Sequence, residues 1–137
     1  MVSLALYTGK KGLYNKLLSL FMKIKHVELV VNNLCYSSSA MDGGVRRKSI
    51  DVSNGNWLVI PIEVKDESEI IKFYQQTKKR KYDHVAAVLN HLLRFSIDVF
   101  KWRYTCSEWC ILAINNANRT NLNPNMTLSE LYKYASN

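Results

Sequence analysis

Residues 26–39 have the sequence HVELVVNNLCYSSS, which is typical of a β-hairpin. Two segments rich in β-branched and other apolar residues flank the dipeptide Asn32-Asn33, and asparagine tolerates the positive φ angles of a two-residue hairpin turn. Such a turn pairs Val31 with Leu34 and fixes the register of the two strands. The chain is therefore expected to contain an antiparallel sheet.

The predicted register sorts the hairpin residues into two faces. Residues opposite one another share a face, so Glu28 pairs with Ser37 and His26 pairs with Ser39 on one side of the sheet. The other side is apolar and is expected to face the core. The mixed side carries His26, Glu28, Val30, Cys35, Ser37 and Ser39.

The remaining secondary structure is predicted from periodicity, caps and turn residues. Asp66 and Glu69 have the spacing of a helix cap. Pro61 predicts that its strand lies at an edge or near a bulge, because proline lacks a backbone N–H. Further strands are expected at residues 2–7, 45–52 and 57–64. Helices are expected at residues 12–24, 66–79 and 85–100, and from Thr105 and Thr127 onward.

The order of these elements indicates the fold class. A run of strands followed by a run of helices favours an α+β fold, in which an antiparallel sheet of about five strands packs against helices. The length of 137 residues fits a single domain covering residues 1–137.

The composition limits the class of protein. The chain is 47% hydrophobic and 22% charged, which excludes a mainly disordered protein. Three cysteines, an odd number, argue against a disulfide framework and favour a cytoplasmic location. Neither a signal peptide nor a membrane-spanning segment is expected from the sequence. The net charge of +8 and the cluster Lys78-Lys79-Arg80-Lys81 would attract polyanions. No nucleic-acid-binding motif accompanies them, so nucleic acid is not the expected partner.

Residues 105–110, with the sequence TCSEWC, carry the clearest chemical signal. Thr105 and Glu108 have the spacing of a capping box, which places Cys106 at the first position of a helix. A thiolate there lies at the positive end of the helix dipole, beside backbone amides that have no acceptor within the helix and are suited to bind an oxyanion. The alternative for Cys106 is simple packing in the core, which is also the expected role of the other two cysteines.

A nucleophilic thiol requires a base, and His26 is the candidate. Glu28 lies two residues further along the same strand, where a carboxylate can orient an imidazole and support its basicity. The alternative is that Glu28 pairs with a lysine such as Lys25 and that His26 only begins a strand. His84 and His91 lack enough further ligands for a metal site, so no metal is expected.

The order of these residues resembles that of the circularly permuted papain-like (NlpC-type) families. These families include YiiX-like amidases and lecithin retinol acyltransferase-like proteins, and in them the histidine strand precedes the cysteine helix. The likeness covers most of the chain and is closest to small phage-encoded members. The matching segments are KHVELV (25–30), CYSS (35–38), DGGVR (42–46), YD (82–83) and CSEW (106–109).

The resemblance implies a permuted papain-like fold and a set of catalytic residues. Cys106 matches the nucleophile and His26 the general base, and Glu28 is the expected third member of the set. Some of these families place a second histidine on the following strand, where this chain has serines at 37–39 instead. The carboxylate of Glu28 is therefore preferred for that third position.

The implied activity is that of a thiol hydrolase. It cleaves an amide, peptide or acyl-ester bond through a thioester on Cys106, without a cofactor, and its substrate is a peptide, a lipid or another amide. Tyr7, Ser37 and Ser39 are expected near the cleft as further oxyanion-binding or cleft residues. The alternative is a catalytically inactive protein that keeps this fold and binds a protein target of the host. A phage-encoded protein of either kind would act in the host cytoplasm.

Overall fold

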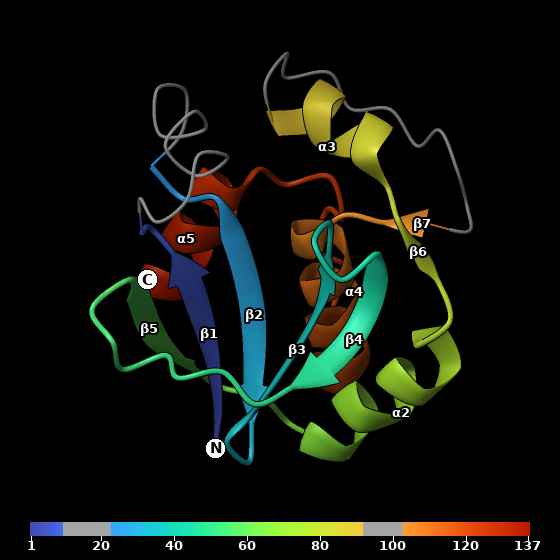
Figure 1. Ribbon diagram of the computed structural model, residues 1–137. Coiled ribbons are helices and arrows are strands. Elements are labelled where there is room, and N and C mark those ends of the chain that lie inside the picture. Colours follow the sequence, from blue (N-terminus) through green and yellow to red (C-terminus); the bar gives the residue numbers. More distant parts are fainter. Residues whose placement is uncertain (10–22, 92–102) are drawn as a thin grey trace.

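The computed structural model of the chain describes residues 1–9, 23–91 and 103–137 (Figure 1). These residues confirm an α+β fold. In the described part of the chain, seven strands form one sheet: β1 Val2–Tyr7, β2 His26–Val31, β3 Leu34–Ser39, β4 Gly44–Lys48, β5 Trp57–Ile62, β6 Lys81–Tyr82 and β7 Arg103–Tyr104. The described helices are α2 Glu67–Thr77, α3 His84–His91, α4 Cys106–Asn118 and α5 Leu128–Ser136.

The sheet is larger than the sequence predicts. Its strand order is β5-β1-β2-β3-β4-β6-β7, and all neighbours are antiparallel except β6 and β7, which are parallel. The expectation of about five strands is too low because β6 and β7 have two residues each, too few for the alternation by which a strand is recognised. β5 lies at an edge, as Pro61 predicts.

The β2–β3 hairpin forms as predicted near its turn but not beyond. Asn32 and Asn33 have φ angles of 50° and 64°, and the pairs run from Val31–Leu34 to Leu29–Tyr36. The expected pairs Glu28–Ser37 and His26–Ser39 are not part of the ladder. Figure 1 shows the reason: β2 and β3 meet at the turn and diverge toward their other ends.

A side chain replaces the missing ladder bond where the two strands diverge. The Ser37 hydroxyl donates a hydrogen bond of 2.7 Å to the backbone oxygen of Val27. The thiol of Cys110, on α4, lies 3.9 Å from the same oxygen. The space between the diverging strands is therefore filled by buried side chains, one of them from the helix behind the sheet.

The other boundaries differ from the predictions in detail. β4 ends at Lys48 rather than at residue 52, and β5 ends at Ile62 rather than at residue 64. Asp66 caps α2 by accepting from the amide of Ser68, whereas its expected partner Glu69 binds Lys72. Two predicted helices fall largely outside the described residues. Of the predicted helix 12–24, only residues 23 and 24 are described, and they are not helical. Of the predicted helix 85–100, the part beyond residue 91 lies outside the described residues.

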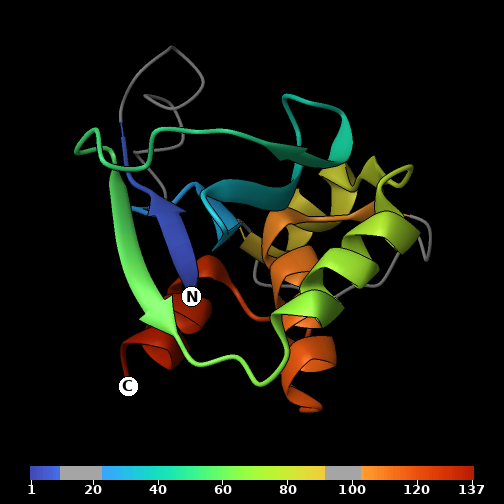
Figure 2. The ribbon, with the colours of Figure 1, turned by 90° about the horizontal axis from the view of Figure 1, so that it is seen from below.

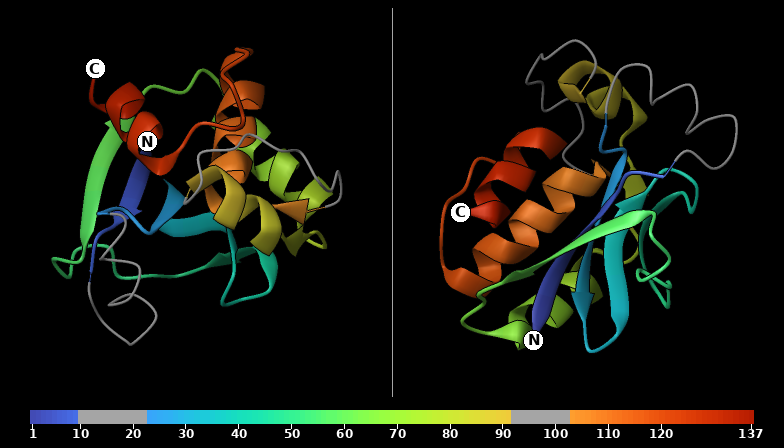
Figure 3. Two further views of the ribbon diagram at one scale, coloured as in Figure 1. Left: turned by 90° about the horizontal axis from the view of Figure 1, so that it is seen from above. Right: turned by 90° about the vertical axis from the view of Figure 1, so that its left-hand side faces the viewer.

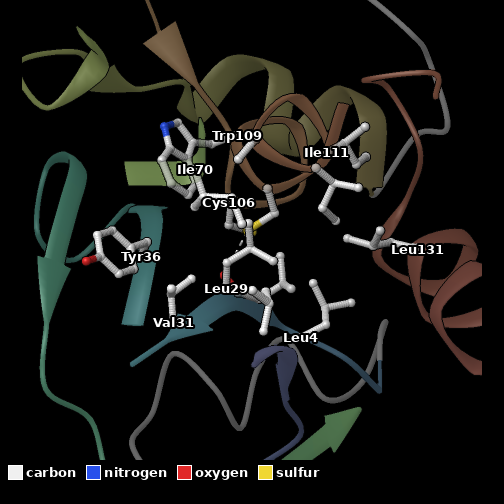
Figure 4. Close-up of a cluster of buried hydrophobic side chains, with 14 of the residues drawn as sticks. Leu4, Leu29, Val31, Tyr36, Ile70, Cys106, Trp109, Ile111 and Leu131 are labelled. Carbon is white, nitrogen blue, oxygen red and sulfur yellow. Dashed lines mark hydrogen bonds between the residues drawn. The ribbon is translucent and has the colours of Figure 1, made fainter. Parts of the chain in front are cut away.

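The helices and one long connection cover the two faces of the sheet. Figure 3 shows α4 and α5 side by side against one face, and Figure 2 shows residues 49–56, which join β4 to β5, crossing the opposite side. The core lies between the sheet and α2, α4 and α5, and Figure 4 shows part of it, with Leu4, Leu29 and Cys106 among its side chains. At its centre the fully buried Trp109 donates a 2.9 Å hydrogen bond from Nε1 to Thr77 Oγ1.

None of the described helices combines the length and the apolar character that crossing a membrane requires.

Candidate active site

Cys106 is the first residue of α4, as the capping box predicts. The hydroxyl of Thr105 accepts from the amide of Glu108 at 3.2 Å, and the carboxylate of Glu108 accepts from the amide of Thr105 at 3.3 Å. Ser38 of β3 donates at 2.7 Å to the backbone oxygen of Tyr104, just before the cap. The sheet and the cap together fix the start of the helix, so the thiol-bearing residue has a defined place.

His26 links the helix to the sheet. Its Nε2 atom lies 2.6 Å from Oε1 of Glu28, and the imidazole is also hydrogen-bonded to the side chain of Cys106. The structure thus brings together the three residues that the sequence singled out, from β2 and from a helix 80 positions later in the chain.

The surroundings of His26 favour its charged form. Burial lowers the pKa of the imidazole, but the hydrogen bonds and negative charges of Cys106 and Glu28 outweigh burial and raise this pKa from 6.5 to about 10. At neutral pH His26 is therefore an imidazolium beside the ionised Glu28.

Arg46, on β4, completes the arrangement and is the residue that sequence reasoning missed. Its Nη1 donates at 2.6 Å to Oε2 of Glu28, and its Nη2 donates to Oε1 of the same carboxylate. Its Nε donates at 2.8 Å to Asp42, which also binds Lys48 at 3.1 Å. Lys25, which was the alternative partner for Glu28, donates to the backbone oxygens of Thr8 and Gly9.

Glu28 is buried and remains ionised. Its side chain has no exposed surface, and burial raises the pKa of the carboxyl group, but the hydrogen bonds and charges of Arg46 and His26 lower it below its usual value of 4.5. A buried carboxylate without such partners would be too costly to keep charged. Arg46 and His26 therefore keep the buried Glu28 carboxylate ionised.

Tyr7 and Trp57 border the imidazole. In the sheet register Tyr7 lies opposite both His26 and Trp57, so the three side chains share one end of three neighbouring strands. The rings of Tyr7 and Trp57 meet edge to face with centroids 5.0 Å apart, and the Trp57 and His26 centroids are 6.4 Å apart. The side chain of His26 is 21% exposed, so the imidazole is partly accessible.

The two serines expected near the cleft have structural contacts. Ser37 is fully buried and donates its hydroxyl hydrogen to the Val27 backbone oxygen, so it supplies no donor to an oxyanion in this arrangement. Ser39 accepts a 3.4 Å hydrogen bond from the amide of Asp42 and so supports the turn before β4. Of the three residues expected near the cleft, Tyr7 is the one that borders the imidazole.

The three cysteines differ in their surroundings. Burial, and then the charge of Glu28, raise the pKa of the Cys35 thiol to about 11. Burial, and then the charge of Cys106, raise the pKa of the Cys110 thiol well above its usual value. Cys106 alone among them contacts an imidazole, although only 3% of its surface is exposed.

Metal ligation receives no support from the part of the chain that is described. In residues 1–9, 23–91 and 103–137 no group of three or more histidine, cysteine, aspartate or glutamate side chains is arranged to hold a metal ion. His84 packs its ring against that of Tyr82, with centroids 4.9 Å apart.

Comparison of the chain with protein-family models, with curated proteins and with solved structures finds no match in any of the three. The functional interpretation therefore rests on the geometry of the site.

Proposed function

We propose that this protein is a cysteine hydrolase with a permuted papain-like fold, which cleaves an amide, peptide or acyl-ester bond through a thioester on Cys106. The observation that carries the proposal is the position of His26, which is hydrogen-bonded both to Cys106 at the start of α4 and to Glu28. A thiol, an imidazole and an orienting carboxylate in this order form the arrangement used for acyl transfer.

Acylation uses the proton that His26 carries. The Cys106 sulfur attacks the carbonyl carbon of the substrate, and the carbonyl oxygen becomes an oxyanion. The backbone amide of Cys106 lies in the first turn of α4, where an amide has no acceptor within the helix, and it is a donor for this oxyanion. As the carbon–nitrogen or carbon–oxygen bond breaks, the His26 imidazolium gives its proton to the leaving amine or alcohol, and a thioester remains.

Deacylation uses the neutral imidazole that acylation leaves. His26 takes a proton from a water molecule as the water oxygen attacks the thioester carbonyl carbon. The carbon–sulfur bond then breaks, the sulfur of Cys106 takes the bonding electron pair beside the imidazolium of His26, and the carboxylic acid product leaves. Glu28 keeps the imidazole in one orientation through both steps.

One observation favours a second function, that of a catalytically inactive binding protein with the same fold. Only 3% of Cys106 is exposed, so a substrate reaches the sulfur only if neighbouring side chains move. A protein-binding role needs no such access. This alternative makes the reactivity of Cys106 the decisive measurement.

The test is acylation followed by mass spectrometry. The folded protein is incubated with a series of p-nitrophenyl acyl esters, and the intact protein and its peptides are analysed for an acyl group. We expect an adduct on Cys106 that turns over, no adduct in Cys106→Ala, and a rate at least about 100-fold lower in His26→Ala. Cys110→Ala, one helical turn further in, is the matched control and keeps the adduct. A folded wild-type protein without an adduct would favour the binding function.

A further inference from the structure

We infer that Arg46 is a positioning residue of this site, which acts through Glu28 to hold the His26 imidazolium against Cys106. The inference rests on the proposed function for its catalytic meaning. Its structural basis is the geometry of one buried carboxylate that is shared between a guanidinium and an imidazole.

Arg46 determines the orientation of the Glu28 carboxylate. Two guanidinium nitrogens donate to the two oxygens of the same carboxylate, a forked contact that fixes both its position and its plane. One of these oxygens, Oε1, is also the atom that contacts His26. Any rotation of the carboxylate away from Arg46 therefore moves the oxygen that orients the imidazole.

Asp42 holds Arg46 from the other side. It accepts from Nε at 2.8 Å, so the guanidinium cannot turn without losing contacts at both ends. Lys48 in turn binds Asp42, and these two side chains are 51% and 30% exposed. A series of alternating charges thus runs from the surface of β4 to the buried thiol.

The groups that face Glu28 explain why its charge depends on Arg46. His26 comes from its own strand and Arg46 from β4, while Cys110 approaches from α4 and Cys35 from β3. The thiols provide no positive charge, and the positive charge of His26 itself depends on Glu28. Arg46 is the cation in this set whose charge is independent of the others.

The experiment compares Arg46→Met with Arg47→Met. Arg47 is the next residue on β4, but its guanidinium lies 5.8 Å from the ring centroid of Tyr74, so its loss changes the net charge equally without touching Glu28. For each variant, the titration of the His26 ring is followed by NMR, and the rate of Cys106 alkylation by iodoacetamide is measured against pH.

We expect the His26 titration midpoint to fall by at least about one pH unit in Arg46→Met. Without its cation the buried Glu28 carboxyl group takes up a proton, and it then no longer stabilises the charged imidazole. The pH profile of Cys106 alkylation should shift with this midpoint, and Arg47→Met should behave as the wild type. The midpoint of Arg46→Lys should lie between those of the wild type and Arg46→Met, since an ammonium keeps the charge but not the fork. An unchanged midpoint in a folded Arg46→Met protein overturns the inference. If Arg46→Met does not fold, Arg46→Lys decides, and a wild-type midpoint there overturns it equally.

The outcome separates this inference from the proposed function. A shifted His26 midpoint in a protein whose Cys106 never forms an acyl adduct supports the positioning role and contradicts hydrolysis. A wild-type midpoint in a protein that does form the adduct contradicts the positioning role alone.

Discussion

The carboxylate of Glu28 lies 2.6 Å from the Nε2 atom of His26, two positions earlier on the same strand. This contact lies where β2 and β3 diverge, beyond the last paired residues of the two strands. The consequence is a charged pair at the boundary between the sheet and α4. Four predictions follow from this pair, from the helix cap and from the turn that leads into β4.

The first prediction concerns the charge of Glu28. In Glu28→Gln the shape and one acceptor oxygen are kept, but the negative charge that holds the proton on His26 is lost. The pKa of His26, raised to about 10 in the wild type, should fall by at least about one unit, as measured by NMR titration. Glu69→Gln removes an exposed carboxylate bound to Lys72 and is the control. A midpoint that stays near 10 in Glu28→Gln would show that Cys106 alone maintains the imidazolium.

The second prediction concerns acid stability. The pKa of Glu28 is lower in the folded protein than its usual value of 4.5, so the ionised group contributes stability above pH 4.5 and loses this contribution as the pH falls below it. The wild type should therefore lose stability relative to Glu28→Gln between about pH 5 and pH 3. Urea denaturation of both proteins across this range measures the difference. If the difference in unfolding free energy between the two proteins did not change with pH, Glu28 would not be an ionised partner of Arg46 in the folded state.

The third prediction uses the two capping boxes of the chain. Thr105 caps α4 next to Cys106, and Thr127 caps α5 in the same way, far from it in sequence. Replacement of either threonine by alanine should cost about 1 kcal/mol of unfolding free energy. Only Thr105→Ala should also slow the alkylation of Cys106, because it loosens the turn that carries the thiol. Equal alkylation rates in the two variants would mean that the cap does not position the sulfur.

The fourth prediction concerns the turn that leads into β4. A Cβ atom at Gly44 (φ 156°) would lie 2.2 Å from the backbone oxygen of Arg80, whereas at Gly43 (φ 80°) it would meet open space. Gly43→Ala should cost about 1 kcal/mol for its backbone conformation alone. Gly44→Ala should cost more than about 2 kcal/mol, because β4 and β6 must separate. Thermal denaturation measures both, and a cost at Gly44 no larger than at Gly43 would contradict the close approach of these strands.

Several parts of the fold could be predicted because their causes lie within a few residues. The Asn32-Asn33 turn follows from the tolerance of asparagine for positive φ, and the start of α4 follows from hydrogen bonds between Thr105 and Glu108, three residues apart. The order of strands and helices then indicates the α+β class. By contrast, β6 and β7 are strands because they pair with segments that are distant in the sequence. No local sequence pattern predicts such pairing.

The sequence alone determined the local conformations and the residue types of the site, namely a cysteine at a helix start and a histidine and a glutamate on one face of a strand. Only the tertiary structure decided that Arg46 reaches Glu28 and that His26 meets Cys106. Caps and turns are set by short-range sterics and hydrogen bonds, which the neighbouring residues specify. The charged contacts depend on where β2 and β3 diverge and on which helix lies behind them, and these are properties of the packed chain as a whole.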